Sequence, residues 1–401
     1  MVARIHLALA ALVVVAGLIG GAAMQLELWQ PGGAWSADHY SRMLGVHGLL
    51  WIALGAPALA GCFGRAAIVR LLGARCALGP IAWVGLALWV IGLVATIVAL
   101  PRQVDTGWTL YTPYQEDMAT SFDVGRVIGP IALAAAGLAH AVHLGAAIAR
   151  ARDVAPAKLA LAAALVIAIA VACLGALVGV FSLAPSPAFV QAATGLTAVV
   201  LVTAALDTER PLLALIAIAC AAAWAFTPLR VLGVGVAGIW IALAMIGGAR
   251  RPVAALVVLG IAPVMLVQIG ARVLLELTSD DSFLHDTHFE VGAHHSLGAI
   301  VAFAGLVALH AWGSMLVRRI PHAVIAWIGA GVLGVGTLLH VYASLRIGLR
   351  GMPRRYWDYD PEFASGHMLS GVGAAIAIGG LVLLAVAWVA GRSVGTDRSS
   401  T

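Results

Sequence analysis

The chain has 401 residues, of which 62% are hydrophobic and only 10% are charged. A soluble globular domain has about 45–50% apolar and about 25% charged residues, so this composition excludes a water-soluble globule of this size. Disordered, collagen-like and disulfide-scaffold proteins are excluded by the same values. The net charge of +5 is spread over loops without a Lys/Arg-rich stripe, which argues against a nucleic-acid partner. The composition therefore predicts a polytopic membrane protein.

Twelve apolar runs approach the length of about 20 residues that a spanning helix needs, which predicts an all-α bundle of about 12 transmembrane helices. The first run follows Arg4 and also resembles a signal peptide, but it is long enough to span a bilayer, and we expect an uncleaved helix. In chain order, we expect spans near residues 5–28, 43–64, 78–100, 127–149, 158–181, 189–206, 211–225, 229–248, 253–275, 291–315, 321–347 and 367–390.

The charges on the two sides of this bundle indicate its orientation. With twelve spans, both termini lie on one side, together with fourteen of the 23 Lys and Arg residues and four of the 18 acidic residues. An excess of Lys and Arg marks cytoplasmic loops. We therefore expect a multi-pass protein of a bacterial-type inner (cytoplasmic) membrane with both termini in the cytoplasm. Residues 1–391 would form a single transmembrane domain, and residues 392–401 a polar cytoplasmic tail.

Histidines supply the first candidate site, because ionisable groups at membrane depth are costly and are usually functional. His47 is predicted about one turn into the second span, and His294 and His295 about one turn into the tenth, counted from the outer side. Neutral imidazole is a common iron ligand. Imidazoles at matching depth on two helices favour a haem held from both sides. Hydrogen bonding between helices is the alternative for a single histidine.

The propionates of a haem require nearby cations and donors. Arg354 and Arg355 lie in an outer loop, where they break the rule that cytoplasmic loops carry the positive charge. Guanidinium groups matched to carboxylates would explain this exception, and a solvated pair is the alternative. Trp108, in another outer loop, has an indole N–H that can donate to a propionate. These residues and the histidines together favour a haem site near the outer face.

Five stretches, taken in chain order across nearly the whole sequence, carry a resemblance to one family. They are Gln30-Pro31-Gly32; His47-Gly48-Leu49-Leu50 with Pro57-Ala58-Leu59-Ala60-Gly61; Gly107-Trp108-Thr109-Leu110-Tyr111; Leu284-His285-Asp286-Thr287-His288-Phe289; and Gly351-Met352-Pro353-Arg354-Arg355-Tyr356. Together they resemble subunit I of the haem-copper oxidase superfamily (cytochrome c oxidase subunit I-like), whose fold also has twelve spans.

The resemblance assigns roles to several of these residues. It implies that His47 and His295 are the axial ligands of a low-spin haem, and that Arg354 and Arg355 hold its propionates. It also implies that one family arginine, which contacts the formyl group of haem a, is replaced here by Gln25. A single haem b, which lacks the formyl group, is therefore expected.

An outer metal site is also implied, because His285 and Asp286 match a family pair at a metal and water site above the haems. With His288 and Glu290 they form a cluster whose side chains are of the types that bind zinc or copper. A half-exposed acidic loop is the alternative interpretation.

The sequence departs from the family at the oxygen-reducing centre. The family's high-spin haem ligand falls at Ala293, and His294 is one residue away, about 100° around the helix. Only a local distortion would let His294 bind a second haem. No histidine occurs between His143 and His285, where the family has its copper ligands, and the lysine and glutamate of its proton channels have no counterpart. A second haem and a copper ion in the membrane core are therefore not expected.

The other histidines are weaker candidates. His140 and His143 share one face of the fourth span in its inner half, where they are either a second haem or metal contact or part of the hydrogen-bonded core. His340 lies in the eleventh span and could face a cofactor. His310 and His322 receive no role, and His39 and His367 are expected at the outer surface.

These observations favour an electron-transfer membrane cytochrome with one low-spin b-type haem. The expected partners are membrane lipid, other membrane or periplasmic respiratory subunits, and a soluble cytochrome or a quinol as donor. The first alternative is an active terminal oxidase or nitric oxide reductase with relocated ligands. The second is a non-enzymatic subunit for haem or metal handling, or for assembly.

Overall fold

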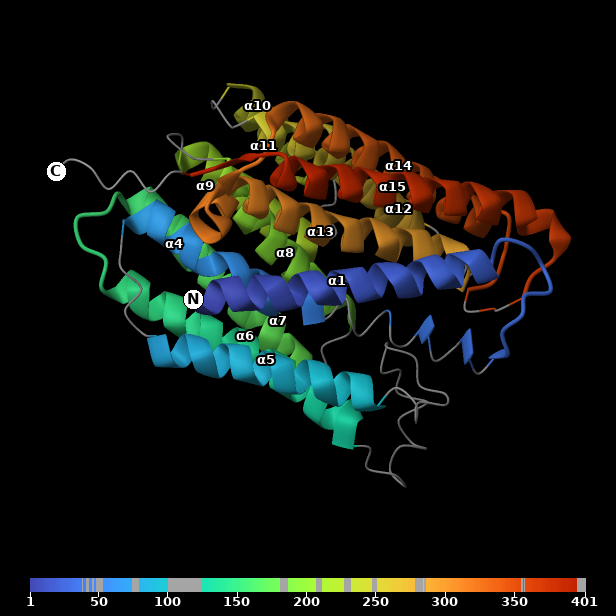
Figure 1. The fold of residues 1–401 in the computed structure, drawn as a ribbon, viewed down its shortest axis with the longest axis horizontal. Helices are drawn as coiled ribbons and strands as arrows, with labels where there is room; N and C mark the ends of the chain where they lie inside the picture. The colour runs from blue at the N-terminus through green and yellow to red at the C-terminus, as the bar shows by residue number, and fades with distance from the viewer. Residues whose placement is uncertain are drawn as a thin grey trace.

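The computed structural model describes residues 1–37, 39–40, 43–44, 47, 53–73, 79–99, 124–180, 187–206, 211–226, 232–246, 251–277, 284, 286–354, 356 and 358–394. These residues form a bundle of long helices (Figure 1). The helices are α1 Val2–Glu27, α3 Ala56–Leu59, a π-helical turn Ala60–Gly64, α4 Arg65–Leu72, α5 Gly79–Ala99, α6 Val124–Ala149, α7 Pro156–Val180, α8 Pro187–Ala205, α9 Pro211–Phe226, α10 Leu232–Ile246, α11 Arg251–Ala255, a π-helical turn Leu256–Ile261, α12 Ala262–Leu277, α13 His288–Val317, α14 Ala323–Leu349, a 3₁₀ turn Pro361–Phe363 and α15 Ala364–Val389.

The prediction of an all-α, polytopic membrane protein is confirmed. Within the described ranges, eight helices are long and apolar enough to cross a membrane, and two shorter apolar helices accompany them. Large apolar side chains remain on the outside of the bundle, among them Leu12 at 66% exposure and Met245 at 72%. Exposing such side chains to water would be unfavourable in free energy, whereas they are compatible with the hydrocarbon core of a bilayer.

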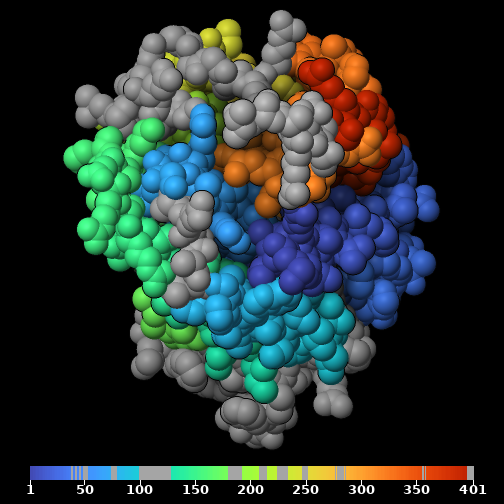
Figure 2. Space-filling view, turned by 60° about the vertical axis from the view of Figure 1, so that its left-hand side comes forward, coloured from blue at the N-terminus to red at the C-terminus, as the bar shows by residue number. Residues whose placement is uncertain are grey.

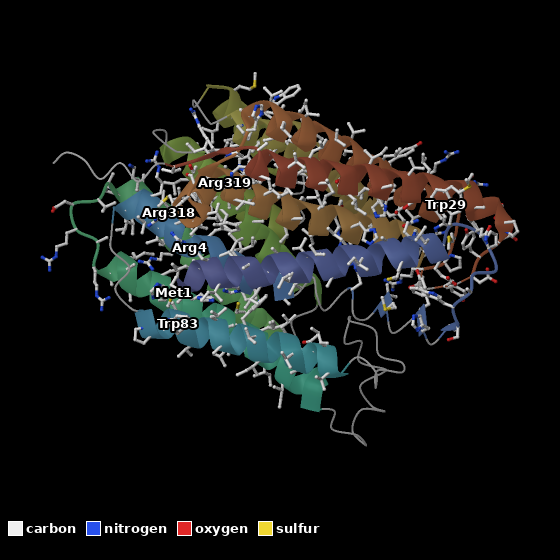
Figure 3. All side chains as sticks on the ribbon, in the orientation of Figure 1. Met1, Arg4, Trp29, Trp83, Arg318 and Arg319 are labelled. Atoms are coloured by element: carbon white, nitrogen blue, oxygen red, sulfur yellow. The ribbon has the colours of Figure 1, made fainter. Side chains whose placement is uncertain are left out.

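The two ends of the bundle differ in the side chains that they carry. Helix α1 runs along the length of the molecule, with the α5–α6 pair on one side and α13, α14 and α15 on the other (Figure 1). Arg4, Arg318 and Arg319 lie at one end, which we call the basic end, and Trp29 lies at the opposite end (Figure 3). We call the latter the Trp29 end. The His47–His295 candidate site belongs to the half of the bundle nearer the Trp29 end.

A short antiparallel ladder lies at the basic end. Strand β1, Arg319–Ile320, pairs with strand β2, Arg392–Ser393. The Arg319 guanidinium also donates to the carbonyl oxygens of Val389 and Gly391. The first two residues of the predicted polar tail are therefore held against the α13–α14 connection.

Helices α14 and α15 pack with their backbones in direct contact. A Cβ atom at Gly336 would overlap the backbone nitrogen of Ala377, and one at Gly373 would overlap that of His340. Small residues permit this close approach, which is a common basis of helix association in membranes. The contact at Gly373 brings His340 of α14 beside the start of α15.

Helix α13 approaches α14 in the same way. A Cβ atom at Gly348 would overlap the backbone nitrogen of Phe289, and one at Gly292 would lie 2.9 Å from the backbone nitrogen of Leu345. The first turns of α13 are therefore pressed onto the last turns of α14. This packing places His295, two turns into α13, against α14.

Candidate functional site

His47 and His295 come from segments far apart in the sequence and lie close together. Their ring centroids are 6.3 Å apart, and the ring planes are inclined by 81°. His47 also lies against α1, where a Cβ atom at Gly21 would be 3.5 Å from His47 Cε1. Two imidazoles that bind one metal ion from opposite sides, each at about 2.0–2.1 Å, have ring centres about 6 Å apart. The observed spacing fits this arrangement.

A third histidine contacts His295. His340 of α14 places its Nε2 2.9 Å from His295 Nδ1, with the two ring centroids 4.9 Å apart. On its other side, His340 Nδ1 lies 3.1 Å from the Ser370 carbonyl oxygen and 2.9 Å from the Ser370 hydroxyl oxygen. The three residues form a hydrogen-bonded chain from α13 through α14 to α15.

The carbonyl of Ser370 determines where the protons of this chain lie. A carbonyl oxygen only accepts, so His340 Nδ1 carries the N–H. A neutral His340 then has a lone pair on Nε2, and His295 Nδ1 must donate to it. His295 is left with its lone pair on Nε2, the form in which a histidine binds a metal through that atom. A second residue that fixes the tautomer of a ligand in this way is typical of metal sites.

Gln25 lies at the far end of the same chain. Its Nε2 donates to the His367 carbonyl oxygen at 3.2 Å, and its Oε1 accepts from the Ser370 hydroxyl at 3.5 Å. Gln25 therefore ties α1 to α15 and reaches His295 through Ser370 and His340. The sequence resemblance places Gln25 near a haem substituent. In the structure, two residues of the hydrogen-bonded chain, Ser370 and His340, stand between Gln25 and the His295 ring.

The loops that carry Asp286 and Arg354 are bound to each other. The Arg354 guanidinium donates to Asp286 Oδ1 at 2.9 Å, and the Arg354 backbone N–H donates to the Asp286 carbonyl oxygen at 2.9 Å. Thr287 and Pro353 form an isolated antiparallel bridge between the same loops. Gly351 adopts φ +90°, a conformation that favours glycine and turns the chain into this bridge. The two sequence motifs that contain Asp286 and Arg354 thus form one structural unit.

Within the described residues, the ion pair leaves donors on Arg354 for another ligand. The Asp286 side chain is 78% exposed, whereas that of Arg354 is 15% exposed. The ion pair occupies Nη2 of Arg354, and a guanidinium has five N–H donors in all. An arginine held in one orientation by its neighbour is well prepared to bind a carboxylate.

His294 belongs to a different group from His295. Its Nδ1 donates to the Glu290 carbonyl oxygen at 2.7 Å and lies 3.6 Å from Glu290 Oε1. Arg272 of α12 lies 3.7 Å from the same carboxylate oxygen. The structure therefore joins His294 to an ionic cluster between α12 and α13, away from the His47–His295 pair.

The loops at the Trp29 end are joined by polar contacts. Asp358 Oδ1 accepts from the backbone N–H groups of Gly32 and Tyr359, each at 2.8 Å, and these bonds hold the pKa of Asp358 below its usual value. The Tyr359 hydroxyl donates to the Leu28 carbonyl oxygen at 2.7 Å. Burial, with the Asp358 charge as a second cause, raises the pKa of Tyr359 to about 12. These bonds hold the end of α1, and so Gln25, against the segment that leads into α15.

Three of the predicted site residues, Trp108, His285 and Arg355, lie outside the described residues. Over the part of the chain that is described, no group of three His, Cys, Asp or Glu side chains is arranged to hold a metal ion. Because His285 is not among those residues, the predicted metal pair with Asp286 stays a prediction.

His367 differs from its expected place at the outer surface. It is buried, and its Nε2 lies 2.9 Å from the sulfur of Met352. Its ring also packs on Tyr359 at 4.3 Å and on His288 at 5.2 Å. The expectation was wrong because the loop with Met352 and Tyr359 folds back over the start of α15. His39 is exposed, as expected, with its ring against Trp35.

Sequence reasoning left one residue of this site, His340, without a partner. His340 is 45 residues from His295, and no local motif connects them. The only available signal was its depth in the eleventh span. The glycine contacts between α13, α14 and α15 decide which face of α14 meets His295.

Comparisons with known proteins identify the family to which the chain belongs. Residues 1–202 match the family described as "Cytochrome C and Quinol oxidase polypeptide I". The chain is 37% identical to cytochrome c oxidase polypeptide 1 of Halobacterium salinarum over 128 residues, which is 30% of this chain and 21% of that protein. It is 31% identical to cytochrome c oxidase subunit 1 of Bacillus subtilis over 133 residues, 31% of this chain and 21% of that protein.

A third relative is cytochrome c oxidase subunit 1 of Cereibacter sphaeroides, with 34% identity over 113 residues, 26% of this chain and 19% of that protein. The matched segments thus span about a fifth of the length of each of these three relatives. The family match extends over slightly more than half of the chain and includes α1 and His47. The chain belongs to the cytochrome c and quinol oxidase polypeptide I family.

Proposed function

We propose that this protein is a membrane b-type cytochrome that transfers electrons and lacks the oxygen-reducing centre of its family. One low-spin haem b would be held by His47 and His295. The observation that supports this proposal best is the 6.3 Å between the two ring centroids, reached by residues from different parts of the chain. A haem held between two imidazoles supplies reversible one-electron transfer and has no open position for dioxygen.

The protein's own residues prepare this site. His340 accepts from His295 Nδ1 and leaves the His295 Nε2 lone pair available to a metal. Arg354, held by Asp286, has N–H donors for a propionate. We propose that Arg355 and Trp108 also bind a propionate. Gln25 replaces the family arginine that contacts the formyl group of haem a, which fits a haem b without that group.

The sequence supports the lack of an oxygen-reducing centre. Ala293 stands where the family has its second haem ligand, and no histidine occurs between His143 and His285 to hold copper. His294, the neighbouring imidazole, is bonded to Glu290. Apolar side chains cannot ligate copper. An electron that reaches the haem proposed between His47 and His295 would therefore have to pass to another protein.

The proposed setting is a bacterial-type inner membrane with the basic end in the cytoplasm. Arg4, Arg318 and Arg319 lie at that end (Figure 3), as the positive-inside rule requires. The Trp29 end would then face outward, with Asp358, Asp360 and Glu362 in one of its loops. We propose that a soluble cytochrome or a quinol delivers electrons there and that other respiratory subunits complete the complex.

The wild-type protein tests this proposal directly. After purification, we expect one iron per chain, a low-spin b-type spectrum on reduction, no copper and no carbon monoxide binding. Haem extraction, metal analysis and reduced-minus-oxidised spectra measure these properties. Two haems with carbon monoxide binding would instead indicate a terminal oxidase or nitric oxide reductase. Exchangeable haem well below one per chain would indicate a haem-handling or assembly subunit.

His340 is expected to act as a positioning residue for His295. In His340→Ala, the hydrogen bond to His295 Nδ1 is lost, so His295 becomes a weaker electron donor to iron. We expect the haem midpoint potential to rise and haem affinity to fall by roughly 10–100-fold. Potentiometric titration and haem-retention assays measure both.

The variant His340→Gln separates positioning from packing. Its side-chain oxygen can accept from His295 Nδ1, so the potential should return towards the wild-type value. A potential that stays at the wild-type value in His340→Ala would show that His340 only fills space.

A further inference from the structure

A second group of histidines lies towards the basic end, away from the candidate haem site. His6 of α1 and His140 of α6 have ring centroids 5.4 Å apart, and His143 follows one turn later on α6. All three side chains are buried. His6 also packs on Trp89 of α5, with ring centroids 4.6 Å apart. Three helices thus enclose this cluster, which we call the inner histidine cluster.

Hydrogen bonding within the described core does not account for the buried nitrogens of His6 or for His140 Nε2. Among the described residues, neither ring nitrogen of His6 has a hydrogen-bond partner, and His140 Nε2 has none. A buried polar atom left without a partner costs about 1–3 kcal/mol. Such atoms in a folded protein call for an explanation, and an ion or ligand is one of the few available.

Two glycines make room for the imidazoles. A Cβ atom at Gly61 would overlap His6 Nδ1 and would lie 2.8 Å from His140 Nε2. A Cβ atom at Gly85 of α5 would lie 2.6 Å from His140 Cε1. The nitrogens from α1 and α6 therefore approach one another against Gly61. This glycine belongs to the π-helical turn Ala60–Gly64, a distortion that is frequent at functional sites.

A small cavity adjoins the cluster. It has a volume of about 50 Å³ and is lined by His140 and His143, by Arg65 and by the first residues of α1, Val2 and Ala3. This volume is enough for a water molecule or an ion. The start of α1 is exposed at this end of the molecule beside α5 (Figure 2). An ion from the aqueous side could reach the histidines without crossing the apolar core.

We propose that His6 and His140 bind one transition-metal ion of the zinc or copper type, with His143 or a cavity water completing its coordination. Neutral imidazoles suit these ions, whereas magnesium and calcium prefer carboxylate oxygens, and none of the residues that line the cavity has a side-chain oxygen. Two imidazoles on one tetrahedral ion, each at about 2.0–2.1 Å, have ring centres about 5 Å apart. His6 and His140, at 5.4 Å, match this value. Among the described residues, no group of three His, Cys, Asp or Glu side chains is arranged to hold a metal ion, so His143 would have to turn towards the pair to act as the third ligand in place of water.

Metal titration of the purified, haem-containing full chain tests the proposal. After treatment with a chelator, the wild-type protein should bind one Zn²⁺ per chain, and Co²⁺ should give the visible bands of a tetrahedral nitrogen site. His6→Ala and His140→Ala should each weaken binding on the order of a hundredfold or more, because even residues that only support a ligand contribute 10–100-fold. Haem content should stay at the wild-type level, which separates this site from the proposed haem site.

His310→Ala is the matched control. His310 is also buried, and its Nε2 likewise lacks a hydrogen-bond partner in the described part of the chain, but it packs on Trp388 of α15. Metal binding should be unchanged in this variant. If His140→Ala does not fold, His6→Gln near the start of α1 replaces it. The proposal is overturned if the wild-type chain binds no stoichiometric metal, if the His6 and His140 variants bind as wild type does, or if His310→Ala loses binding equally.

Discussion

Purified His47→Ala and His295→Ala proteins are expected to lose the low-spin b-type absorption bands of the wild-type chain. Each substitution removes one of two imidazoles whose ring centroids are 6.3 Å apart, and iron with a single axial histidine is no longer low-spin. Haem content should fall well below one per chain, most strongly in the double variant. Reduced-minus-oxidised spectra and haem extraction, normalised to protein, measure the loss.

His294→Ala provides the control on the same helix. His294 is adjacent to His295 in the chain, yet it bonds to the Glu290 carbonyl at 2.7 Å. This variant should keep its haem and its low-spin spectrum. A low-spin band that survives in both His47→Ala and His295→Ala, or one lost only in His294→Ala, would refute the ligand assignment.

Gly380→Val is expected to be the most destabilising single substitution between α14 and α15. A Cβ atom at Gly380 would overlap the backbone nitrogen of Leu333 and lie 2.6 Å from its Cα. Backbone atoms cannot rotate away, so the two helices must separate. Overpacking typically costs about 1–3 kcal/mol, and we expect a value of about 3 kcal/mol or more here. Thermal unfolding in detergent should show a clearly lower Tm, together with poorer recovery of folded protein.

Gly379→Val is its matched control. A Cβ atom at Gly379 meets nothing within 4 Å, so valine points away from the helix contact. Because glycine is also a weak helix former, this change should alter stability by no more than about 0.5 kcal/mol. Equal Tm values for the two variants would show that the α14–α15 contact does not require a glycine at position 380.

The transmembrane architecture could be predicted from the sequence because apolar runs are local. Each of the twelve predicted spans corresponds to a helix or to consecutive helices in the structure, wherever it is described. The sixth and seventh predicted spans, 189–206 and 211–225, are the shortest of the twelve and have the weakest boundaries, and α9, the helix at the seventh, is among the shorter helices described. The two π-helical turns among the described residues were not predicted, since an extra residue in a helical turn leaves no mark on hydropathy.

The candidate haem site could be predicted in part. The depth of His47 and His295 follows from counting residues into each span, and the structure brings these two rings together. The pairing of Asp286 with Arg354 could not be predicted, although each residue lies in a sequence motif that resembles the family. Each motif was interpreted separately because the two residues are 68 positions apart in the sequence.

The amino-acid sequence alone determined that this chain is a membrane-spanning helical bundle and at what depth its histidines lie, because hydrophobicity and helical rise act along the chain. Only the tertiary structure decided which imidazoles meet: His340 with His295, and His6 with His140. The rotation of each helix about its axis determines these pairs. That rotation depends on close contacts such as Gly373 with His340 and Gly61 with His6, which join residues distant in sequence.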